Sequence, residues 1–237
     1  MIRYRAFRIF PLAGAVLLAG LAACQPVATA TEVTRLPAPA VDATTAPAGH
    51  DQVAVLAGGC FWGIEAVFEH VKGVRKVTAG YSGGVANTAH YDEVSDGNTG
   101  HAESVKIEFD PSQVSYGRLL QVFFSVALNP TELNRQGPDT GPQYRSVIFY
   151  DNAGQKKIAS DYIAQLSAAK AFAAPIVTQV LPLEAFYPAE NYHQHYYELH
   201  PDNPYIVFND VPKVEHLHKL FPSLYQPGRQ FVEVELH

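Results

Sequence analysis

The sequence predicts one α+β domain whose core has the order βαββαβ. Short apolar runs typical of strands alternate with longer segments whose apolar residues have helical spacing. The order strand–helix–strand occurs twice, which is the pattern of a split βαβ arrangement. Residues 51–226 carry this pattern and are numerous enough to bury a hydrophobic core of their own.

The elements follow in chain order from this periodicity. We expect core strands at 52–57, 74–80, 103–109 and 144–150, core helices at 60–71 and 115–127, and an added helix at 153–169 and strand at 175–181. Ser115 is placed to cap the second helix, and Asn152 lies at the start of the third. Beyond Leu181 the chain shows little periodicity, so we expect a long, mostly coil C-terminal segment with a short helix near 211–220.

The N-terminus indicates export. Residues 1–23 begin with three arginines and continue into an apolar run that is too short to span a bilayer, as in a signal peptide. Leu21-Ala22-Ala23-Cys24 resembles the lipobox of bacterial lipoproteins, which implies cleavage before Cys24 and acylation of its thiol. In Gram-negative lipoproteins a residue other than Asp after the anchor, here Gln25, favours sorting to the outer membrane, so this resemblance implies a protein on the periplasmic face of the cell envelope. The alternative is an ordinary signal peptide that leaves Cys24 as a free thiol.

The next segment, residues 24–50, is rich in Ala, Pro and Thr and has no apolar periodicity, which predicts a flexible tether. Residues 227–237 form a C-terminal tail. The whole chain has a net charge of −6, and removal of three arginines with the signal peptide gives 14 − 23 = −9. An acidic chain without a basic stripe argues against nucleic acid as a partner. We expect a monomer.

Cys60 is the candidate reactive group. The chain has two cysteines, and if Cys24 is acylated, Cys60 is the one thiol of the mature protein in an oxidising compartment. Gly58 and Gly59 separate it from the strand at 52–57, and helical spacing follows, so Cys60 is expected in the first turn of a helix. Backbone N–H groups there would lower its pKa. The alternative is an inert cysteine buried under the helix.

Five sequence blocks carry a family resemblance. The first, Gly59-Cys60-Phe61-Trp62-Gly63, resembles the signature of the A-type peptide methionine sulfoxide reductases, which reduce the S-epimer of methionine sulfoxide. The others occur in the family's order at 80–84, 100–103, 136–146 and 186–194. The resemblance covers 53 to about 225. It implies a ferredoxin-like core, free or protein-bound methionine sulfoxide as substrate, and no bound cofactor.

Glu103 is the candidate proton donor. Apolar residues at 105, 107 and 109 alternate as in a half-buried strand, and on that parity Glu103 points inward. A carboxyl group in an apolar environment stays protonated to higher pH. A glutamate solvated at the strand edge is the alternative. The resemblance implies that Glu103 protonates the sulfoxide oxygen.

Four aromatic residues have implied roles beside the nucleophile. Tyr81 and Tyr144 resemble the family tyrosines that hydrogen-bond the sulfoxide oxygen, where phenolic donors would stabilise developing charge. Phe61 and Trp62 resemble the residues of the apolar pocket for the substrate's terminal methyl group. Simple packing of the helix on the sheet is the alternative for Phe61 and Trp62.

Supporting substrate-binding residues are implied on two loops. Asp139 lies between Gly-Pro pairs and resembles the carboxylate that orients the polar network. Glu190 and His193 resemble members of the C-terminal segment that closes over the site.

Other functions fit fewer residues. Cys60 with His193 could form a thiol hydrolase, but that leaves the tryptophan, Glu103 and the tyrosines unused. A catalytically silent lipoprotein that only binds partners is a third possibility. The pairs His193/His195 and His216/His218 have a spacing that points helical side chains apart, and no cysteine or carboxylate cluster completes a ligand set, so we predict no metal.

The thiol cycle predicts an external partner. Reduction of a sulfoxide would leave a sulfenic acid at Cys60, and no second cysteine follows it in the chain. Regeneration therefore requires an external thiol reductant, which we expect to be a thioredoxin-like protein or a small thiol.

Overall fold

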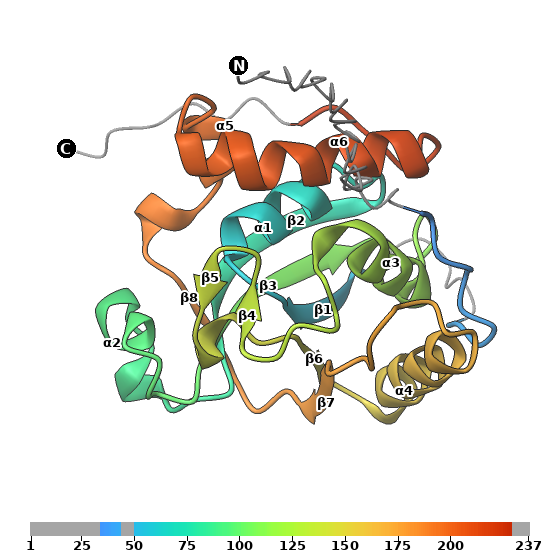
Figure 1. Cartoon of the computed structure of the whole chain (residues 1–237), viewed down its shortest axis with the longest axis horizontal. Coiled ribbons are helices and arrows are strands. Elements are labelled where there is room, and N and C mark those ends of the chain that lie inside the picture. The colour runs from blue at the N-terminus through green and yellow to red at the C-terminus, as the bar shows by residue number, and fades with distance from the viewer. Residues whose placement is uncertain (1–33, 44–49, 229–237) are drawn as a thin grey trace, which may run out of the picture. The chain divides into compact units, whose positions relative to one another are not determined.

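The fold is given by a computed structural model, which describes residues 34–43 and 50–228 (Figure 1). The predicted signal peptide 1–23, the predicted lipidation site Cys24 and residues 229–237 of the predicted tail lie outside the described residues. The elements are β1 (Gln52–Ala57), α1 (Phe61–Glu69), β2 (Val74–Ser82), η1 (Ala86–Thr88), α2 (Tyr91–Ser95), β3 (Ala102–Phe109), α3 (Tyr116–Val122), η2 (Phe123–Ala127), β4 (Arg135–Gln136), β5 (Asp139–Thr140), η3 (Pro142–Tyr144), β6 (Val147–Tyr150), α4 (Ala153–Ala168), β7 (Gln179–Pro182), β8 (Phe186–Pro188), η4 (Asn191–His193), α5 (Tyr196–Leu199), η5 (Ile206–Asp210) and α6 (Val211–Leu220).

The main sheet of the described chain has the strand order β7-β6-β1-β3-β2-β8. All neighbours are antiparallel except β6 and β7, which are parallel. Strands β6-β1-β3-β2 with helices α1 and α3 form the ferredoxin-like βαββαβ core, so the predicted fold class is confirmed. Helix α4 and strand β7 are the predicted additions.

The core lies mainly between the sheet and helices α1, α3 and α4. Phe61, Ile64 and Phe68 of α1 repeat at helical spacing and are fully buried against it. A smaller cluster around Val55 and Phe149 fills the opposite face of the sheet. Helix α6 packs on α1 (Figure 1). Because both faces of the sheet are covered by hydrophobic clusters, the connection between β1 and α1 is held in a fixed position.

Element boundaries differ from the predictions where tertiary contacts intervene. Ser115 and Asn152 cap α3 and α4 as expected, with side chains that accept from the N–H groups of Arg118 and Gln155. The strand predicted at 144–150 begins at Val147, because Gly141-Pro142 starts a 3₁₀ turn that ends at Tyr144. Strand β7 begins at Gln179 rather than 175, since its pairing with β6 starts opposite Val147. The short elements α2, β4, β5 and β8 were not predicted.

Part of the predicted tether is packed on the domain. Leu36 is 9% exposed, its N–H donates to Ser125 Oγ at 3.2 Å, and its carbonyl accepts from Gln121 Nε2 at 2.5 Å. Tyr162 of α4 donates its hydroxyl to the carbonyl of Pro37 at 2.8 Å. The expectation of a flexible tether is therefore wrong for 34–43. Its backbone is paired by side chains of distant helices, which leaves no periodic signal in the sequence.

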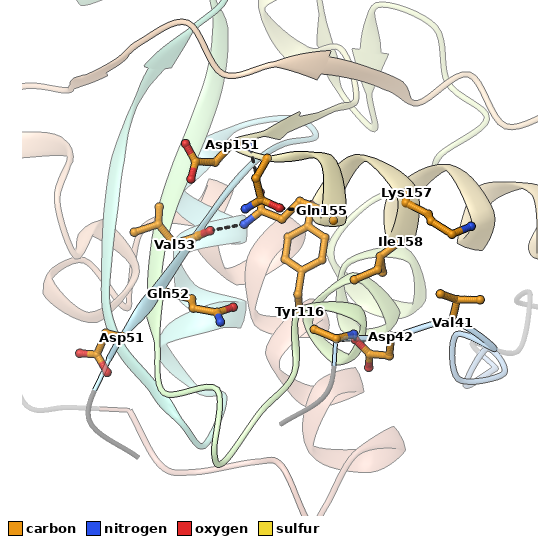
Figure 2. Close-up of a pocket in the computed structure, with 13 residues that line it drawn as sticks. Val41, Asp42, Asp51, Gln52, Val53, Tyr116, Asp151, Gln155, Lys157 and Ile158 are labelled. Carbon is orange, nitrogen blue, oxygen red and sulfur yellow. Dashed lines mark hydrogen bonds between the residues drawn. The ribbon is translucent and has the colours of Figure 1, made fainter. Parts of the chain in front are cut away.

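A pocket of about 710 Å³ lies beside this segment (Figure 2). Val41 and Asp42 line it together with Tyr116 and the start of α4. Gln155 bridges the elements there, because its Nε2 donates to the carbonyl of Val53 at 2.7 Å. None of the predicted site residues lines this pocket, so it is separate from the expected chemistry.

Replacing Leu36 by alanine is expected to lower the free energy of unfolding by about 2 kcal/mol, because it leaves a cavity in the hydrophobic cluster to which this buried side chain belongs. Urea unfolding of the full chain measures the change. Leu133→Ala is the matched control, since Leu133 is 66% exposed and its truncation leaves no cavity. Equal stability of the two variants would contradict the docking of this segment.

Candidate active site

Cys60 lies at the turn between β1 and α1. Helix α1 begins at Phe61 and Cys60 is its N-cap, one residue before the predicted first turn. Gly59 has φ +103°, and a Cβ on it would lie 2.7 Å from Cβ of Gln136, so only glycine fits this turn. The Cys60 side chain is partly exposed, and the backbone N–H of Trp62 faces its sulfur.

The predicted lowering of the Cys60 pKa is wrong. Burial raises the pKa of this thiol well above its ordinary value, and the carboxyl groups of Glu103 and Asp210 raise it further. The Trp62 N–H and the Lys213 ammonium group act in the opposite direction but are weaker. Cys60 is therefore a neutral thiol, and a change in the charge of its neighbours is needed to favour the thiolate.

Glu103 is buried next to this turn, as its predicted inward orientation required. It is 2% exposed, and its Oε2 accepts from the N–H of Phe61 at 3.0 Å. Burial raises the pKa of Glu103 to about 8, assisted by Asp139 and opposed by the Phe61 N–H. The carboxyl group is thus protonated at neutral pH and can donate a proton at the helix end where Cys60 lies.

Phe61 and Trp62 differ in their surroundings. Phe61 is fully buried in the core, so the packing alternative describes it better than a pocket wall. Trp62 is partly exposed and stacks on Tyr196, with ring centroids 3.7 Å apart and an interplanar angle of 6°. Tyr205 meets the indole edge-on at 5.8 Å. Trp62, Tyr196 and Tyr205 therefore form an aromatic wall, which fits an apolar group of a ligand.

The two predicted tyrosines are also placed differently. Tyr81 pairs with Glu103 across β2 and β3, but it is fully buried, and its hydroxyl donates to Oε2 of Glu190 at 2.9 Å. Tyr144 is partly exposed, and its pKa is raised by burial and by the nearby Glu103, Asp139 and Cys60. Tyr144 is the better placed phenol for a ligand at Cys60.

Tyr91 is a site residue that sequence reasoning missed. Burial raises the pKa of its phenol, and Glu103, Cys60 and Asp139 add to the shift, so it belongs to the same cluster as Tyr144. Its backbone N–H donates to Oε1 of Glu190 at 3.0 Å. The five-residue helix that begins at Tyr91 has too little periodicity to be found in the sequence.

A pocket of about 340 Å³ opens at Cys60. Its lining combines the loop before Asp139 with the C-terminal segment, including Tyr205, Asn209 and Lys213. The hydroxyl of Tyr205 donates to Oδ2 of Asp139 at 2.5 Å, which joins the two segments. Asp139 therefore has a hydrogen-bond partner from a part of the chain without a sequence signal, and its implied role in orienting a polar network stays a prediction.

Asp210 and Lys213 form a second missed feature. Asp210 is fully buried, and Nζ of Lys213 lies 3.0 Å from its Oδ1. A Cβ on Gly63 would lie 2.1 Å from the same oxygen, so the last glycine of the block 59–63 makes room for this ion pair. Both charged groups act on the Cys60 thiol.

His193 supports the aromatic wall instead of the thiol. Its Nδ1 accepts from the indole N–H of Trp62 at 3.2 Å, and its ring lies 5.0 Å from that of Phe61. Burial lowers the pKa of His193, so the ring is neutral. Within the described chain no hydrogen bond joins it to Cys60, which disfavours the cysteine–histidine hydrolase.

Comparison with known proteins identifies the family. Residues 52–224 match the family model of peptide methionine sulfoxide reductase. The chain belongs to the peptide methionine sulfoxide reductase family. It is 60% identical to peptide methionine sulfoxide reductase MsrA 2 of Mesorhizobium japonicum over 174 residues, which are 73% of this chain and 89% of the relative. It is 52% identical to MsrA 2 of Synechocystis sp. over 182 residues, which are 76% of this chain and 85% of that relative.

Solved structures agree with this assignment to the methionine sulfoxide reductases. Reduced Mxr1 from Saccharomyces cerevisiae superposes with a TM-score of 0.57 at 30% identity, covering 64% of this chain and 87% of that one. Methionine sulfoxide reductase A of Corynebacterium diphtheriae gives a TM-score of 0.55 at 34% identity, covering 64% and 76%. The family assignment favours sulfoxide reduction over the hydrolase.

Proposed function

We propose that this chain reduces the S-epimer of methionine sulfoxide, free and in proteins, with Cys60 as nucleophile and Glu103 as proton donor. The observation that carries the proposal is the placement of a neutral carboxyl group, with a pKa of about 8, at the helix end that holds the Cys60 thiol. A sulfoxide needs both groups, because its oxygen leaves only when it is protonated.

The reaction balances with these groups. The Cys60 sulfur attacks the sulfoxide sulfur while Glu103 protonates the oxygen, and the phenols of Tyr144 and Tyr91 donate hydrogen bonds to it. The thiol proton also reaches the oxygen, the S–O bond breaks, water leaves, and a sulfonium joined to Cys60 by an S–S bond remains. A water molecule then attacks the Cys60 sulfur and breaks the S–S bond, its proton restores Glu103, and the products are methionine and a Cys60 sulfenic acid. The aromatic wall at Trp62 receives the substrate's methyl group.

An external dithiol or two monothiols complete the cycle. One thiol displaces water from the sulfenic acid and forms a mixed disulfide, and the second releases Cys60 as a thiol together with the reductant's disulfide. The sequence supports this step because Cys24 is the only other cysteine and precedes the domain. A thioredoxin-like protein or a small thiol of the cell envelope is the proposed reductant.

The proposed location is the cell envelope, with Cys24 acylated and the enzyme repairing oxidised envelope proteins as a monomer. No helix in the described stretches combines the length and apolar character needed to cross a membrane. Since 34–43 is docked, only residues 25–33 separate the anchor from the packed chain, and nine residues span at most about 30 Å. The enzyme would therefore work close to the membrane surface.

The test is a stereochemical assay. The purified full chain with dithiothreitol is expected to consume the S-epimer of methionine sulfoxide and leave the R-epimer. Without a reductant it should release one methionine per Cys60. Peptide hydrolysis, or no reduction of either epimer, would overturn the proposal.

Cys60→Ser is expected to abolish turnover, because no other thiol lies in the described site. The matched control is Cys24→Ser, which removes the other cysteine and should leave turnover of the purified protein unchanged. Loss of activity in the control but not in Cys60→Ser would contradict the assignment of the nucleophile.

A further inference from the structure

Two buried carboxyl groups meet a histidine on the side of α1 that faces α5. Glu65 and Glu69 are one helical turn apart and lie on the same face of α1. His195 comes from the segment between η4 and α5 and has φ +56°. One ligand atom from each of the three residues lies within 4.8 Å of the other two.

The hydrogen bonds of this cluster leave two oxygens without partners. Oε2 of Glu65 accepts from the N–H of His195 at 2.9 Å, and Oε1 of Glu69 lies 2.5 Å from Nδ1 of His195. Glu65 is 1% exposed and Glu69 is 5% exposed. The second oxygen of each carboxyl group is buried and has no hydrogen-bond partner among the described residues. Unpaired buried carboxylate oxygens are costly, so each calls for a partner.

We propose that Glu65, Glu69 and His195 bind a divalent cation of the Zn²⁺ class. Two carboxylate oxygens and one imidazole nitrogen are ligands that such ions accept, and a water molecule would fill the remaining position. The single imidazole of His195 cannot pair with both carboxylates, whereas a divalent cation would neutralise both. Entry is possible because His195 is partly exposed and lines a groove of about 840 Å³.

The proposal differs from the sequence prediction of no metal for a specific reason. That prediction placed His193 and His195 on one helix and found no carboxylate cluster nearby. In the structure η4 ends at His193, so the two rings diverge: His193 meets Trp62, while His195 meets the two glutamates of α1. The carboxylates lie far away in the sequence, which hid the cluster.

A cation here would tie two parts of the active site together. Helix α1 carries Cys60 at its start, and the segment around His195 carries His193 and Tyr196, which contact Trp62. A metal bond between them would hold the aromatic wall against the helix that bears the thiol. The inference does not depend on the proposed reaction, because it concerns binding alone.

The experiment uses Co²⁺ as a spectroscopic substitute for Zn²⁺. Titration of the full chain is expected to give one bound Co²⁺ with visible d–d absorption and without the charge-transfer band of a thiolate ligand. Zn²⁺ should displace it and raise the Tm. No binding, or a thiolate band that disappears in Cys60→Ser, would overturn the proposal.

Two variants and one control make the site assignment specific. His195→Asn keeps a residue that tolerates positive φ, and Glu69→Gln keeps the side-chain shape, so each should weaken Co²⁺ binding more than about 100-fold. Circular dichroism and the metal-free Tm check that each variant folds. His90→Asn alters an exposed histidine elsewhere and should bind Co²⁺ like the unchanged chain. Equal loss in His90→Asn, or retention in His195→Asn, would contradict the proposed ligands.

Discussion

Replacing Glu103 by glutamine is expected to lower kcat for methionine sulfoxide reduction by about 10²–10⁴-fold. The amide keeps the size of the side chain and an oxygen that can accept from the Phe61 N–H, so the end of α1 should stay intact. It cannot supply the proton that the leaving oxygen needs. Steady-state assays with dithiothreitol measure the loss, and circular dichroism verifies the fold.

The pH profile separates proton donation from a structural role. Because burial raises the pKa of Glu103 to about 8, its acid form is present below that pH and disappears as the pH rises through it. Activity of the unchanged enzyme should therefore fall above about pH 8, and this limb should be absent in Glu103→Gln. Glu108→Gln on the same strand, a half-exposed residue paired with Lys106, is the control and should keep the full profile. An unaltered kcat in Glu103→Gln would remove this residue from the mechanism.

Sequence patterns within a single element were enough to predict two features of the site. Alternation along β3 was sufficient to orient Glu103, and the glycine pair before Cys60 was sufficient to place the strand-to-helix turn. Tyr205 lies in the C-terminal segment, and its hydrogen bond to Asp139 depends on the path of the whole chain. Lys213 pairs locally with Asp210, three residues earlier, but the sequence carries no sign that this pair lies beside Cys60.

The wrong direction for the Cys60 pKa has the same origin. A helix N-terminus is a local feature, and its favourable N–H group is present at Trp62. Burial and the carboxyl groups of Glu103 and Asp210 come from tertiary packing, and together they outweigh it. Local rules predicted where the thiol lies, but its protonation depends on residues that the fold brings to it.

Lys213→Met is expected to destabilise the protein by about 3 kcal/mol, because it leaves the fully buried Asp210 carboxylate without its cation. Asp210→Asn should cost less, since the Lys213 ammonium group is 24% exposed and can turn to water. In the Asp210→Asn background the lysine replacement should have little further effect. Urea unfolding of the single and double variants measures this coupling, and additive losses would contradict it.

The same two variants should move the reactivity of Cys60 in opposite directions. Asp210 raises the pKa of the thiol and Lys213 lowers it, so the thiolate fraction rises in Asp210→Asn and falls in Lys213→Met. Alkylation by iodoacetamide near pH 8 should be several-fold faster in the first variant and slower in the second. Lys157→Met, which removes a lysine that is 66% exposed on α4, should leave the rate unchanged. A shift of both variants in one direction would indicate a general loosening of the pocket, whereas opposite shifts require that the charges of this buried pair act on the sulfur.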